Sequence, residues 1–112
     1  GIFESQTFNA GSDVQFNTFK ATAALPSQTE LLYQVGIARA SADGSCNGVQ
    51  VVFVGPDGTP TTKFATGSAL PVSADGVGFE NPGQCLRYKG FFSSSDVNQS
   101  PTLYDIRFNY SL

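Results

Sequence analysis

The end of the chain, from Thr102 to Leu112, alternates between two kinds of side chain without interruption. One set is apolar and would point to one side of an extended strand: Tyr104, Ile106, Phe108, Tyr110 and Leu112. The residues between them are mostly polar. A period of two over such a stretch predicts a strand with one buried face. A second strand is predicted from Cys85 to Ser93, and we expect the two to form the central hairpin of an antiparallel sheet.

The rest of the chain consists of short stretches of strand pattern separated by Gly, Pro, Ser and Asn. No helix and no repeat is predicted. About seven or eight strands at this spacing predict an all-β fold, an antiparallel β-sandwich formed by a single domain over residues 1–112. The remaining strands are expected at 3–8, 14–23, 30–39, 49–54, 59–66 and, as a short piece, 69–72, with a turn at 9–13.

The stretch from Glu30 to Arg39 has the strongest strand pattern in the first half. Its expected inward residues are Leu31, Tyr33, Val35 and Ile37. Glu30 to Gln34 could also begin a helix, but Gly36 and the β-branched residues favour a strand. Residues 49–54 are almost continuously apolar, which predicts burial on both faces. The Pro-Asp-Gly turn at 55–58 should fold residues 59–66 back against them as a hairpin.

Charge is sparse, with a net value of −3 and 13% charged residues. The basic residues are scattered rather than clustered, which argues against a nucleic-acid partner. They are Lys20, Arg39, Lys63, Arg87, Lys89 and Arg107. No apolar run approaches the ~20 residues of a membrane-spanning helix, so no direct membrane span is predicted.

The two cysteines, Cys46 and Cys85, have no neighbouring histidine and no CxxC spacing. A structural disulfide is the simplest interpretation, with two free thiols as the alternative. A disulfide would stabilise the fold by ~4 kcal/mol in the chain-entropy model. It would also indicate a secreted, extracellular protein.

Catalytic chemistry is poorly supported because the chain contains no histidine. That excludes Ser-His and Cys-His nucleophile systems and the commonest zinc ligand. We predict no catalytic residue, no metal and no cofactor, although carboxylates such as Glu4 and Asp105 could still pair. Asp96 to Asn98 resembles part of a calcium loop, but a turn explains it better. The asparagines Asn98 and Asn109 begin weak N-glycosylation patterns.

Residues 49–112 carry a resemblance to a known kind of module. Its motifs are the stretches Val51–Thr59, Asn81–Lys89, Ser94–Asp96 and Ser100–Tyr110. They are similar to a secreted bacterial β-sandwich module with a Phe-Val-Gly-Pro-Asp-Gly-Thr turn, an Arg-Tyr strand and a final Pro-x-Leu-x-Asp strand. In particular, the chain resembles the separate C-terminal globular subunit of split type IV pilins.

The resemblance implies a structural, non-catalytic subunit of an extracellular, cell-surface filament. Gly1 to Glu4 is followed at once by polar strand sequence rather than by a long apolar helix. Such a subunit would therefore dock on a short helical pilin partner and on copies of itself. The candidate partner contacts are apolar residues that interrupt the strand patterns and that a free sandwich is expected to leave exposed: Ile2, Phe3, Phe19, Phe91 and Leu112. The alternative is a carbohydrate-binding or adhesive module of a bacterial surface protein, because exposed tyrosines can stack on sugars.

Overall fold

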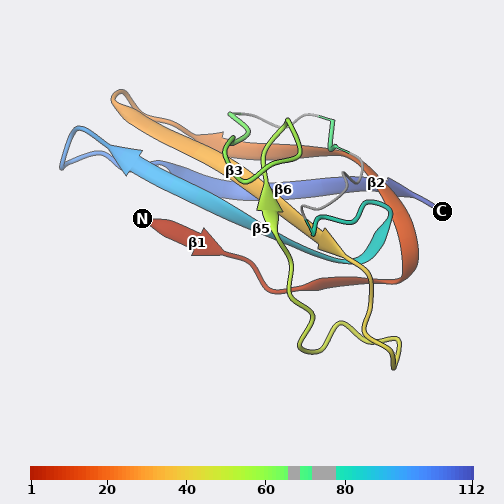
Figure 1. Ribbon diagram of the computed structural model, residues 1–112. Helices are drawn as coiled ribbons and strands as arrows, with labels where there is room; N and C mark the ends of the chain where they lie inside the picture. Colours follow the sequence, from red (N-terminus) through yellow and green to blue (C-terminus); the bar gives the residue numbers. More distant parts are fainter. Residues whose placement is uncertain (66–68, 72–77) are drawn as a thin grey trace.

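The computed structural model describes residues 1–65, 69–71 and 78–112, and these ranges contain strands and turns but no helix (Figure 1). The predicted all-β, antiparallel class is confirmed, and the described residues form six strands, where seven or eight are expected for the whole chain. No described segment meets the length and apolarity that a membrane-crossing helix needs. The strands are β1 (Ile2–Glu4), β2 (Phe8–Ala24), β3 (Thr29–Ala38), β4 (Phe53–Val54), β5 (Gly83–Ser94) and β6 (Thr102–Ser111).

The long strand β2 belongs to two parts of the sheet, and Figure 1 shows it bending sharply at one end of the molecule. Its first residues pair with β5, and those after the bend pair with β6. The register shifts between Asn9 and Val14, where Gly11 has a φ of 84° and donates its N–H to Asn9 Oδ1. The prediction that a turn at residues 9–13 ends a strand is therefore wrong. These residues bend β2, and the strand continues beyond them.

Two layers result from this bend. In the first, β5 lies between β3 and the N-terminal strands, and β4 extends the far side of β3. The second consists of β6 and the later part of β2. Phe108 of β6 lies 6.0 Å, ring to ring, from Tyr88 of β5, although these strands are not hydrogen-bonded to each other. This face-to-face packing is compatible with a β-sandwich.

The expected central hairpin of residues 85–93 with 102–112 is wrong in its pairing. Both strands exist, and β5 is central, but its two edges are occupied by β3 on one side and by β1 and β2 on the other. With no edge of β5 left to pair with, β6 pairs with β2 in the other layer. The connection at 95–101 therefore crosses from one layer to the other.

The expected hairpin of residues 49–54 with 59–66 is also wrong. Its turn is present, with Gly58 N–H donating to the Gly55 carbonyl at 3.0 Å. The residues on either side of the turn do not pair with each other as strands, because both pair with β3 instead. β4 pairs with Val35 and Gly36, and Phe64 forms a bridge to Tyr33. Residues 51–53 are half-buried rather than buried on both faces. The expected strand at 69–72 lies partly outside the described residues.

The core lies between the two layers, and β3 contributes its expected inward face. Leu31, Tyr33, Val35 and Ile37 are all buried, which confirms the strand and its orientation. Strand β2 and the connections contribute Val14, Phe16, Phe19, Phe64 and Phe79, and β5 contributes Leu86. Each fully buried side chain of this size contributes about 1.5–3 kcal/mol relative to an exposed one.

The disulfide joins Cys46 to Cys85, as the sequence predicts. It ties the loop after β3 to the buried start of β5. A second tie is Asn81, which is buried and forms hydrogen bonds with both the N–H and the carbonyl of Phe16. These two contacts anchor the ends of the long connection between β3 and β5.

Candidate docking groove

An open apolar groove runs along β6, between this strand and the N-terminal edge of the first layer. It consists of two adjoining hollows of about 500 and 370 Å³ that share Tyr88 and Ile106. The larger hollow is also lined by Ser5, Gln6, Phe8, Leu86, Phe108 and Tyr110. The smaller one continues past Phe3, Phe92, Pro101, Thr102, Leu103, Tyr104 and Asp105.

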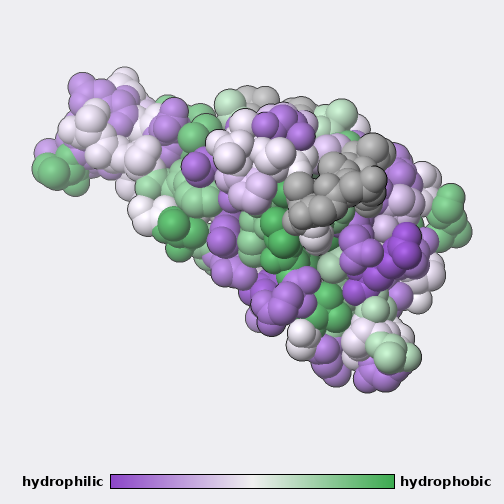
Figure 2. Space-filling model, viewed as in Figure 1, coloured by the Kyte–Doolittle hydropathy of each residue, from purple (hydrophilic) through white to green (hydrophobic). Residues whose placement is uncertain are grey.

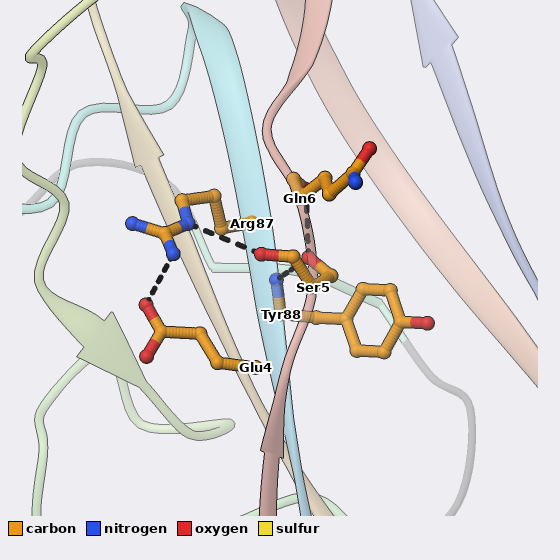
Figure 3. A network of polar contacts seen from close by, with 5 residues as sticks. All are labelled: Glu4, Ser5, Gln6, Arg87 and Tyr88. Atoms are coloured by element: carbon orange, nitrogen blue, oxygen red, sulfur yellow. Dashed lines mark hydrogen bonds and ion pairs between the residues drawn. The ribbon is translucent and has the colours of Figure 1, made fainter.

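One wall of the groove is the segment between β1 and β2, which is fastened to β5 by polar contacts (Figure 3). Ser5 and Tyr88 exchange hydrogen bonds of 2.9 Å, one between their backbones and one from Tyr88 N–H to Ser5 Oγ. Arg87 donates to the Ser5 carbonyl and forms an ion pair of 2.6 Å with Glu4. Figure 3 shows the Tyr88 ring pointing away from the Arg87 guanidinium, so the charged pair lies on one side of β5 and the groove on the other.

The other wall is β6, whose apolar face is covered only in part. Ile106 and Phe108 are half-buried, as expected for inward residues, but Tyr110 and especially Tyr104, at 69%, are exposed. The pairing with β2 goes from Asp105 directly to Leu103, which leaves Tyr104 as the extra residue of a bulge. The bulge changes the phase of the alternation, so Leu103 packs on the core where Tyr104 was expected.

The chemistry of the groove is that of aromatic rings with few polar groups. Burial raises the pKa of the Tyr88 hydroxyl, and the negative charge of Asp105 raises it further. Asp105 is itself paired with Arg107 at 2.7 Å. The described residues contain no group of His, Cys, Asp or Glu side chains that could hold a metal ion. The arrangement is suited to burying an apolar partner surface and to stacking on flat ligands.

The five candidate contact residues lie in different places. Phe3 lines the groove, with its ring 6.1 Å from that of Tyr88. Ile2 and Phe91 are cross-strand neighbours, and Ile2, next to Phe3 in the strand, points to the opposite face. Leu112 is fully exposed beyond the end of β6.

Phe19 was expected to be exposed, and this is wrong: it is 3% exposed. Its ring packs against Tyr33, Phe64 and Phe108. The register with β6 skips Asn17, so a bulge places Phe16 and Phe19, three residues apart, on the same inward face. The alternation in the sequence gives no sign of this bulge.

Several acidic side chains accept hydrogen bonds within turns, as their Gly and Ser neighbours in the sequence predict. Asp43 accepts hydrogen bonds from Ser41 and Ser45, which lower its pKa to about 2. The pKa of Asp57 is lowered by Thr62 and Thr59 in the same way. Asp96 accepts from the Asn98 N–H within the turn at 96–99, in keeping with a turn rather than a calcium loop.

On the face shown in Figure 2, apolar surface forms separate patches between hydrophilic areas. Two of these lie at the ends of the molecule, near the C-terminus and at the tip between β5 and β6 (Figures 1 and 2).

Searches of family models, curated proteins and solved structures give no match for this chain. The site is therefore interpreted from its own geometry.

Proposed function

We propose that this chain is a structural, non-catalytic subunit of an extracellular type IV pilus-like filament, and that its groove docks a short helical pilin partner. The observation that carries the proposal is the open apolar face of β6. Its alternation is typical of a strand with a buried face, yet a large part of that face is uncovered in the single chain. A partner would complete the burial.

The length of the groove suits a helix. The wall from Thr102 to Tyr110 spans about 26 Å at ~3.3 Å per residue. A helix of about 18 residues has the same length at 1.5 Å per residue. An apolar stripe on that helix would face the rings of the groove, as in other helix-in-groove complexes.

The exposed rings supply a sizeable part of an interface. Phe3, Phe8, Tyr104 and Tyr110 are all exposed by more than two fifths. At 150–250 Å² per ring, together they would contribute roughly 400 Å². One partner of a standard interface contributes ~800 Å², so these four residues account for about half of it. Contacts with neighbouring copies in the filament would add to this.

The disulfide and the sparse charge fit an extracellular site of action. Disulfides persist in oxidising compartments, and Cys46–Cys85 lies in a chain with 13% charged residues. A weakly charged surface lets copies pack closely without strong repulsion.

The proposal is tested by incorporation into filaments in the native cells. Tyr104→Lys places a charge in the groove at an exposed position, so the subunit should fold, be secreted and yet be absent from sheared filaments. Leu25→Lys is the matched control, because Leu25 is similarly apolar and exposed. Equal incorporation of both variants would contradict docking in the groove, and wild-type filaments lacking this chain would refute the structural role.

A second candidate function is carbohydrate binding, favoured by the exposure of Tyr104 beside Phe3 and Asp105. Sugars stack on such rings and form hydrogen bonds with a neighbouring carboxylate. The purified chain would then be retained on a polysaccharide column, and Tyr104→Ala would abolish retention. A protein that passes through unretarded excludes the polysaccharides tested.

A further inference from the structure

We propose that the free edge of β6 pairs antiparallel with the same edge of a second copy of this chain, forming a two-fold symmetric dimer. The inference goes beyond the proposed function, because this contact needs no helical partner. It follows from a comparison of the sheet edges and from the charges on β6.

The edges of the described strands differ in length and in what covers them. The later part of β2 has its other side bridged from Thr18 to Ala69, with Leu70 N–H donating to the Asn17 carbonyl. β4 covers two residues and β1 three, and strands this short offer little for another chain to pair with. β6 has ten residues and, within the described ranges, is hydrogen-bonded on one side to β2. Its other side presents a row of backbone N–H and C=O groups, which is a template for another strand.

The charges on β6 are arranged so that two copies complement each other. Asp105 and Arg107 lie on the outer face, two residues apart, and already form an ion pair within the strand. Antiparallel pairing about Ile106 places Asp105 of each copy directly opposite Arg107 of the other. The four side chains then form a ring in which each charge has two neighbours of opposite sign.

Other registers are less favourable. Pairing about Arg107 would place the two guanidiniums opposite each other, and a shift by one residue would set the inward face of one strand against the outward face of the other. Lys20 of β2 is already the cross-strand neighbour of Arg107. A carboxylate from the second copy would offset this local excess of positive charge. The charges thus select the register about Ile106.

Dimerisation and groove docking use different faces of β6. Arg107 and Asp105 lie on the outer face with Lys20 and Thr22, whereas Ile106 and Phe108 line the groove. Asp105 also borders the smaller hollow of the groove, so Arg107→Asp is the variant that separates the two surfaces most cleanly. Variants at the two charged positions therefore leave the rings of the groove unchanged. A wild-type chain that is monomeric in solution but enters filaments normally would refute this inference alone. A wild-type chain that dimerises through β6 but is absent from filaments would refute the proposed function alone.

The test is sedimentation of the purified chain and of charge-reversed variants. The dimer fraction of the wild-type chain should rise with protein concentration and should predominate by about 1 mM. Asp105→Arg or Arg107→Asp replaces attractions with repulsions at two symmetric sites, so each should weaken the dimer at least about tenfold. The double variant Asp105→Arg/Arg107→Asp restores the alternating ring and should dimerise like wild type.

The matched control is Arg39→Asp, a charge reversal at another exposed ion pair, which should leave the dimer unchanged. Circular dichroism of each variant establishes that it is folded, which these exposed positions should permit. A monomeric wild type would overturn the inference and leave the edge to a different partner strand. The inference would also be overturned if the single charge reversals did not weaken the dimer, or if the double variant stayed monomeric.

Discussion

The two layers of this fold differ in how completely they are buried. In the first layer, β3 has its inward residues between 0 and 3% exposed and is hydrogen-bonded on both sides. In the second, β6 shows an equally regular alternation, yet Tyr104 and Tyr110 are exposed and one edge is unpaired within the described residues. The same alternating pattern therefore belongs to a fully buried strand face in the first layer and to a partly exposed strand face in the second.

The difference suggests that stability and association are assigned to separate strands. β3 contributes four buried core residues, and β5 contributes Leu86 and the disulfide cysteine Cys85, so these two strands help to hold the domain together. β6 carries a half-covered apolar face and a long free edge, which cost solubility unless a partner covers them. We infer that this layer is kept open for association.

The largest expected effect compares one substitution in the two layers. Ile37→Ala removes a fully buried side chain from β3 and should lower the free energy of unfolding by about 2–5 kcal/mol. Ile106→Ala removes the same atoms from half-buried β6 and should cost less than about 2 kcal/mol. Urea unfolding of both variants measures the difference. Equal losses would show that β6 is as much a part of the core as β3.

The disulfide should have the next largest effect. Cys46 and Cys85 are 39 residues apart, and removing a link over such a loop costs about 4 kcal/mol in the chain-entropy model and often less. The double variant Cys46→Ala/Cys85→Ala should thus unfold at lower urea, which circular dichroism would follow. Since the bond lies away from β6, filament incorporation of any folded fraction should be normal. An unchanged midpoint would contradict a stabilising role.

The smallest effect concerns the turn at Asp43, which lies outside both layers. Its pKa is held at about 2, below the ordinary 3.8, first by Ser41 and then by Ser45. Because the folded pKa is depressed, this carboxylate stabilises the fold fully above the ordinary value, and the contribution is lost as the pH falls toward 2. NMR titration should show the pKa of Asp43 rising in Ser41→Ala. An ordinary pKa in wild type would contradict the turn geometry.

Much of the fold is predictable from the sequence, and the errors share a physical cause. Strands β3, β5 and β6 lie close to where periodicity and turn residues place them. The errors at Phe19 and Tyr104 both come from bulges, because one extra residue reverses the inward–outward assignment on one side of the bulge relative to the other. Sequence alternation does not reveal such an insertion when small polar residues or a tyrosine fill it.

Strand pairing and the groove were harder to predict. Adjacent strands in the sequence usually pair, but β5 and β6 do not, because the N-terminal strands already occupy the edge of β5. The groove is formed by this long-range pairing, so Phe8 and Tyr88 could not be linked to β6 from the sequence. Of the candidate contacts chosen as pattern breaks, Phe3 lines it.

The most direct test of the filament role is electron cryo-microscopy of filaments sheared from the native cell surface. Our account predicts density for this chain around a core of partner helices, with β6 and the Tyr88 side of β5 facing a helix. Filaments that lack the chain, or that contain it with the groove open to solvent, would contradict the account.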